Sequence, residues 1–294
     1  MQSIIKNDTE LRKYIPNILA TVEGEPSLYE KLTPFLETAE FWIETNFAPH
    51  QIISDQVTIS GEPRNLIKQL VTYHAFFIAI PSLDLVLTPN GFGIVNNSNI
   101  APASKERMER LMTPVEKQRD DVLEQYLRYT FLYNNYSYLQ SDQGKYFFAT
   151  LFPNLDPCNR CGITEHRWQE YQRLHEKLII IETTLENEYF SAQQMKTFRR
   201  RILNWSYNKP DTLETTVIES IRNLEISILT DGKPHPQTAR DIVNIIRSEP
   251  TLFSDWAHSD TAKLFTPEVF LKKSPSETIS STIFFVPLSS VMLI

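Results

Sequence analysis

The most restrictive feature of this sequence is a short stretch in which strand-like alternation flanks a turn. Leucine occupies every second position at 83–87, the period of a β-strand. The residues TPNG at 88–91 have turn composition, and apolar residues resume at 92–95. We therefore expect an antiparallel β-hairpin at 83–95, serving either as a contact element or as a local cover on the core. A lone hairpin is marginally stable in water, so it should pack against helices or a neighbouring subunit. Its candidate interface residues are Leu85, Leu87, Pro89, Asn90 and Phe92.

Helical periodicity dominates the rest of the chain. Apolar residues recur every three or four positions, and several segments begin with capping residues such as Ser27, Ser191 and Asp211. The expected helices are 9–20, 28–43, 64–80, 104–133 with a kink or fresh start at Thr113, 168–185, 192–205, 212–228 and 236–247. We expect the prolines at 34 and 81 to bend or end their helices. The predicted fold class is mostly α: a helical bundle with a small antiparallel β-hairpin or sheet.

A loop-like region at 141–163 separates two helical halves. We place the domain boundary at its start, which gives an N-terminal helical domain at 1–140 and a C-terminal helical bundle with a β-rich tail at 141–294. The aromatic run TFLYNNYSYL, just before this boundary, suits either a core edge or a subunit interface. The last sixteen residues are β-branched and aromatic, and Phe284 and Phe285 are candidate interface residues there.

Composition and charge narrow the functional class. The 294 residues are 41% hydrophobic, which is enough for a substantial core, and the formal net charge of −7 disfavours tight binding to nucleic acid. The longest apolar run, 75–80, is much shorter than the ~20 residues of a membrane span, so no membrane partner is expected. Residues 1–8 lack the apolar core of a signal peptide, and we expect a protein made in a reducing cytoplasm.

One cluster has metal-binding character. Cys158 and Cys161 form a Cys-x-x-Cys pair, and His166 and His175 follow. Zinc accepts two thiolates and two imidazoles, but this spacing matches no common finger, and we favour a loop with two free thiols. The sequence also lacks a phosphate-binding loop, a dinucleotide fingerprint and a nucleophile elbow. We therefore expect no metal, no cofactor and no enzymatic activity.

A run of three arginines, Arg199, Arg200 and Arg201, follows Lys196 in a predicted helix. Such a run most often forms a solvated face. It would also suit an acidic surface on a neighbouring subunit or, less readily in an acidic chain, DNA phosphates. Reversing two of these charges would weaken assembly in the second case.

The first half of the chain resembles a known family. The segments LDLVLTPNGFGIV at 83–95, NIAPASKERMERL at 99–111 and, more weakly, 11–40 are similar to head-tail connector (neck, or head-completion) proteins of tailed bacteriophages. This resemblance implies a structural virion protein at the head-tail junction. Subunits would form a homo-oligomeric ring, a dodecamer, between the portal protein and the next neck or tail protein. The ring would extend the channel through which the genome passes, and DNA would be only this passing genome.

A second interpretation stays open. A helical adaptor or regulatory module inside the cell, acting as a monomer or dimer, would explain the helices and the acidity equally well. It leaves the apolar C-terminal segment and the resemblance unexplained. The size of the assembled protein distinguishes the two.

Overall fold

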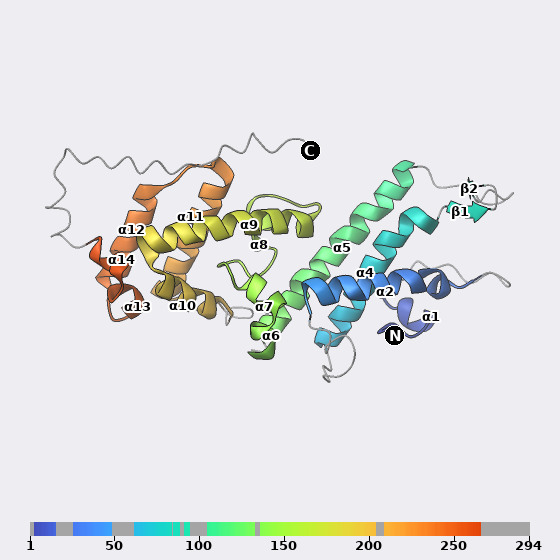
Figure 1. Cartoon of the computed structure of the whole chain (residues 1–294), viewed down its shortest axis with the longest axis horizontal. Coiled ribbons are helices and arrows are strands. Elements are labelled where there is room, and N and C mark those ends of the chain that lie inside the picture. Colours follow the sequence, from blue (N-terminus) through green and yellow to red (C-terminus); the bar gives the residue numbers. More distant parts are fainter. Residues whose placement is uncertain are drawn as a thin grey trace.

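The computed structural model describes residues 3–15, 26–48, 62–83, 85–88, 91–94, 105–132, 136–203 and 209–265. Within them the chain forms an elongated, mostly helical molecule with two ends (Figure 1). The mostly α-helical fold expected from the sequence is thereby confirmed. The C-terminal residues 266–294, which include Phe284 and Phe285, lie outside the described residues.

Three long helices build the N-terminal end. Helix α4 (Glu62–Leu83) packs against both α2 (Leu28–Asn46) and α5 (Lys105–Leu132), and the short α1 (Asp8–Leu11) lies against α2. By length and hydropathy α4 is apolar enough to cross a membrane, but half of its apolar window is buried inside the protein. Its two helical neighbours make it the central helix of this end.

Two four-residue strands lie at the tip of this end. Strands β1 (Leu85–Thr88) and β2 (Gly91–Ile94) pair antiparallel, with Leu85 opposite Ile94 (Figure 1). The predicted turn residues Pro89 and Asn90 lie outside the described residues, so the hairpin as a whole stays a prediction. Leu83, which we expected in the first strand, instead ends α4.

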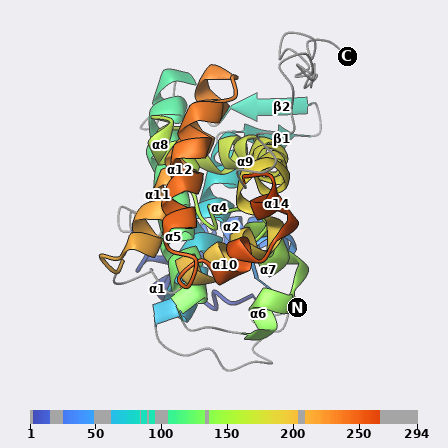
Figure 2. The same cartoon turned by 90° about the vertical axis from the view of Figure 1, so that its left-hand side faces the viewer.

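Short helices join the two ends of the molecule. These are α6 (Tyr136–Gln140), α7 (Asp142–Phe147) and α8 (Asp156–Arg160), and the last two lie in the region 141–163 for which the sequence predicted a loop. The C-terminal end then contains α9 (Arg167–Leu185), the π-helix η1 (Glu186–Phe190), α10 (Ala192–Leu203), α11 (Leu213–Asp231), α12 (Pro236–Ser248), α13 (Ser254–Ala257) and α14 (Asp260–Lys263). Seen end-on, α11 and α12 run side by side next to α9 (Figure 2).

Helix α9 belongs to both hydrophobic cores. Its first half contributes Trp168 and Tyr171 to the core of the N-terminal helices, together with Phe147 of α7. Its second half contributes Leu178 and Leu185 to the core of α10, α11 and α12. The packing therefore continues across the predicted boundary at residue 140, and the division into two domains stays a prediction.

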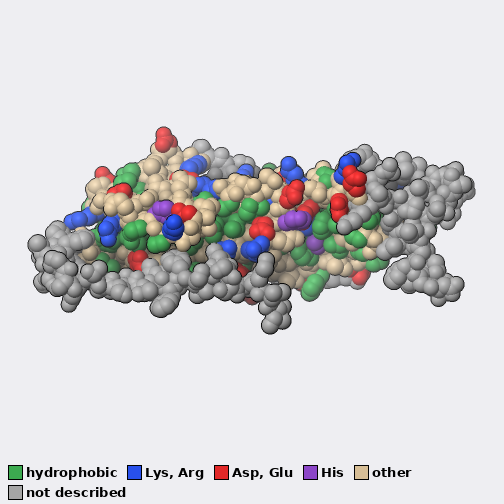
Figure 3. Space-filling model, turned by 90° about the horizontal axis from the view of Figure 1, so that it is seen from above, with side chains coloured by type: hydrophobic (Ala, Val, Ile, Leu, Met, Phe, Trp, Pro, Cys, Tyr) green, Lys and Arg blue, Asp and Glu red, His purple; other side chains and the backbone are tan. Residues whose placement is uncertain are grey.

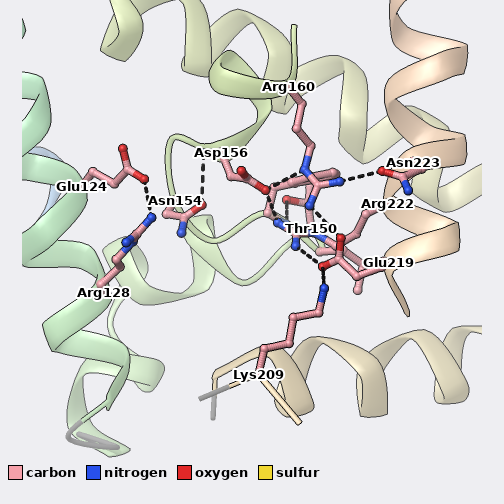
Figure 4. Close-up of polar contacts among 12 residues, drawn as sticks. Glu124, Arg128, Thr150, Asn154, Asp156, Arg160, Lys209, Glu219, Arg222 and Asn223 are labelled. Atoms are coloured by element: carbon pink, nitrogen blue, oxygen red, sulfur yellow. Dashed lines mark hydrogen bonds and ion pairs between the residues drawn. The ribbon is translucent and has the colours of Figure 1, made fainter. Parts of the chain in front are cut away.

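Helix α8 is tied to α11 by a network of ion pairs (Figure 4). Arg160 donates to Asp156 at 2.8 Å and to Glu219 at 2.7 Å, and Arg222 donates to Glu219 at 2.6 Å. Arg222 also bonds Asp156 and lies over the ring of Phe152, 4.5 Å from its centroid. Burial favours the neutral form of Glu219, but the two arginines outweigh it and lower its pKa to about 2.

Candidate functional site

Helix α10 carries the predicted arginine cluster. Its buried face, formed by Met195, Phe198 and Ile202, packs into the C-terminal core. Successive residues of an α-helix point about 100° apart, so three adjacent arginines cannot share one direction. In the structure, Arg199, Arg200 and Arg201 lie in three different environments.

Arg199 points inward. Its Nε and Nη2 donate to Glu182 Oε2 at 3.1 and 2.6 Å, and Nη2 also bonds Glu186. Burial of the guanidinium acts to lower the pKa of Arg199. The carboxylates of Glu182 and Glu186 have the larger effect, so the pKa is raised. The Glu182 side chain is 1% exposed, and burial raises its pKa to about 7 although Arg199 partly opposes the shift. Arg199 is thus held rigidly, with Nη1 unbonded within the described part of the chain.

Arg200 and Arg201 point outward. Arg201 donates to Glu214 at 3.3 Å, across to the start of α11. Arg200 is exposed and forms no ion pair with a described residue, and the same holds for Lys196, one turn earlier. The simple solvated face is therefore the wrong description for Arg199, whereas Lys196 and Arg200 keep free charges.

These two cations border a groove of about 790 Å³ between α10 and the α6–α7 segment. Leu139, Phe148 and Leu203 supply the apolar wall, and Lys145 and the paired Arg199 also line the groove. Lys145 lies 3.5 Å from Asp142, an exposed pair that contributes little. The groove therefore combines an apolar surface with cations, and among its described lining residues Glu186 is the only carboxylate. Its lining residues are Leu139, Gln140, Lys145, Phe148, Glu186, Ala192, Lys196, Arg199, Arg200 and Leu203.

The sequence did not reveal this groove. The sequence showed Lys196 and Arg200 as part of a basic run. Lys145 and Phe148 lie some fifty residues earlier, and only the folding of α7 brings them to the groove. The predicted interface residues Leu85, Leu87 and Phe92 lie at the opposite end of the molecule, on β1 and β2. The structure therefore does not bring the two predicted groups together.

The cysteine–histidine cluster is not assembled as a zinc site. Cys158 is buried, its Sγ donates to the Arg167 carbonyl at 3.2 Å, and burial raises its pKa to about 12. His175 lies between aromatic rings, with the Tyr146 centroid 4.2 Å away, and burial lowers its pKa to about 4. His166 instead pairs with Glu116, at 2.8 Å. Among the described residues, no three His, Cys, Asp or Glu side chains are placed to hold a metal ion.

Charge elsewhere is mixed. On the face shown in Figure 3, basic and acidic side chains are interspersed and do not form one basic field. A DNA-binding surface needs a concentrated basic patch or stripe. This face therefore does not suggest a DNA-binding surface.

Comparison with known proteins gives one match. A family of unknown function (DUF6712) is similar to this chain over residues 15–148, which includes α2, α4, α5, both strands and α7. No curated protein and no solved structure matches the chain. The match ends close to the end of α7.

Proposed function

We propose that this chain is a structural subunit of a bacteriophage neck. Its subunits form a ring at the head-tail junction of the virion, where the portal protein and the next neck or tail protein bind it. The first-half resemblance supports this proposal, and the groove beside α10 is the observation that carries it. The chain is not an enzyme in this proposal, and it needs no cofactor.

The groove suits contact between neighbouring subunits. Subunits in a ring meet head-to-tail, so each one needs two different complementary surfaces. Lys196 and Arg200 are free cations beside an apolar wall in a chain whose net charge is −7. A neighbouring copy carries the same net charge of −7, with 36 acidic against 29 basic residues, and this excess of acid favours electrostatic complementarity with a cationic groove. The net negative charge would also keep the passing genome from adhering to the ring.

The test is a charge reversal in the groove. We expect Lys196→Glu combined with Arg200→Glu to weaken subunit association by about tenfold or more, because two attractive contacts become repulsive. Lys233→Glu combined with Arg247→Glu is the matched control, since both residues are exposed and lie outside the groove. Native mass and negative-stain imaging, alone and with portal particles, measure the assembly.

The outcomes separate the candidates. Rings, or monomers that decorate the portal, in the wild type and control but not in the groove variant support the proposal. A compact monomer or dimer that ignores the portal contradicts it and favours the adaptor function.

A further inference from the structure

A second groove lies at the far side of the C-terminal end, where α9 and η1 meet the start of α12. It is mostly apolar, with a volume of about 120 Å³. Ile180, in its lining, leaves 67% of its surface exposed, so the groove presents an apolar side chain to solvent. Its apolar walls come mainly from Ile180, Leu185, Tyr189, Ile228, Pro236 and Ala239.

The Tyr189 wall of this groove is held in place. The π-helix η1 carries Tyr189, whose backbone carbonyl accepts a hydrogen bond of 2.7 Å from Trp256 Nε1. Trp256 is itself 3% exposed in the C-terminal core. The groove is therefore pre-formed, which lowers the entropic cost of binding an apolar segment.

The end of the described chain contacts Tyr189, one wall residue of this groove. Helix α14 packs on η1, and the ring of Phe265 lies 6.2 Å from the ring of Tyr189. Phe265 is the last described residue. The next apolar group, 269–271 (Val-Phe-Leu), begins four residues later. At about 3.3 Å per residue, four to six residues reach roughly 13–20 Å, enough to enter a groove whose wall Phe265 already touches.

The charges around this segment match those around the groove. Glu268 precedes the apolar group, and Lys272 and Lys273 follow it. Exposed Glu188 and Arg240 both lie close enough to influence Tyr189 electrostatically. The segment and the groove thus share one pattern, an apolar centre with both charge signs at its margins.

We propose that residues 269–271 dock into the α9–η1–α12 groove of their own chain. Phe270 is the anchor, and it covers Ile180. This inference concerns a different surface from the α10 groove, and it does not depend on the neck function.

Cysteine cross-linking of the full-length protein tests the docking. In a Cys161→Ser background, Ile180→Cys combined with Leu271→Cys, which keeps the Phe270 anchor, should form an intramolecular disulfide under mild oxidation. Ile180→Cys with Phe284→Cys is the control, because Phe284 lies fourteen residues beyond Phe270 and should cross-link several-fold less. Non-reducing electrophoresis distinguishes a linked monomer from a linked dimer. A dimer would mean that a second copy fills the groove, and it would overturn the proposal.

Hydrogen exchange gives an independent readout. Phe270→Asp should speed amide exchange in 178–189 and in the first turns of α12, while Phe284→Asp leaves both unchanged. Equal exchange in the wild type and Phe270→Asp would overturn the proposal, whatever the state of assembly.

Discussion

Two buried glutamates are the most unusual residues of the C-terminal end. Glu225 of α11 is fully buried, and neither carboxylate oxygen has a hydrogen-bond partner. Burial, reinforced by the nearby charge of Glu182, raises its pKa well above the usual range. Such a carboxyl group is stable inside a protein mainly in its neutral form. The core thus contains two acids that resist ionisation.

This burial predicts a stability that falls as the pH rises. A group whose pKa is raised in the folded state stabilises the fold fully below its unfolded pKa, and that stabilisation is lost as the pH rises through the folded value. For Glu182 the window runs from its ordinary 4.5 to about 7. We expect Glu225→Gln to raise the free energy of unfolding at pH 8 by roughly 1–3 kcal/mol, since no buried charge then forms at that position.

Urea unfolding at pH 5, 6, 7 and 8 measures this effect. The wild type should lose stability across the series, and Glu225→Gln should show a shallower slope. Asp260→Asn, at an almost fully exposed carboxyl group, is the control and should follow the wild type. Parallel curves for the wild type and Glu225→Gln would show that Glu225 is not the titrating group.

At the scale of elements, the sequence predicted where most long helices lie. The Ser27 capping box is present, with the Ser27 side chain accepting from Glu30 N and Glu30 accepting from Ser27 N. Ser191 Oγ also accepts from Gln194 N, at 3.3 Å. The Gln194 side chain, however, accepts from Trp256 N, a tertiary partner that local spacing does not reveal. Helix α11 is capped by Thr212 and not by Asp211.

The prolines were the main source of error. We expected a helix stop at Pro81 and a kink or fresh start at Thr113, yet α4 continues to Leu83, and α5 runs through Pro114 without a fresh start. Pro34, Pro81 and Pro114 all lie on exposed faces of their helices. Water can therefore bond the carbonyl group that each proline leaves unpaired, while the buried face of the helix stays packed.

The junction between η1 and α10 contains local strain. Ser191 has φ 59° and ψ 143°, a conformation that only glycine adopts readily. We expect Ser191→Gly to stabilise the protein by about 1 kcal/mol, because relief of this strain exceeds the few tenths lost with the Ser191 cap. Chemical denaturation measures it, with Ala192→Gly as a control that should destabilise because it lies inside α10. A loss of stability in Ser191→Gly would contradict the strain.

At the scale of the whole molecule, α9 joins the two cores, and the sequence did not show this. The amphipathic pattern of 168–185 predicted the helix, but it gave no sign that its two halves face different partners. The contacts that determine which core each half of α9 joins are long-range. Trp168 N donates to Asp120 at 3.3 Å, and Arg167 donates to Asp121 at 2.8 Å, both on α5. Predicting such a junction requires knowledge of which helices pack together.

This shared helix predicts a single cooperative unfolding transition for the described helices. Trp168 is 4% exposed, and its ring lies 4.5 Å from that of Phe47 and 6.5 Å from that of Trp42. Trp168→Ala should remove about 3–5 kcal/mol from the N-terminal core, because it leaves a large cavity there. The core formed with α10, α11 and α12 contains other residues of α9 and keeps its own packing. Calorimetry should therefore show one transition in the wild type and two in Trp168→Ala, the earlier belonging to the N-terminal helices.

Phe41→Ala, at a side chain that is 69% exposed on α2, is the control and should keep the single transition. If Trp168→Ala also melts in one transition, the two cores are coupled through more than α9, and the continuous packing defines one domain.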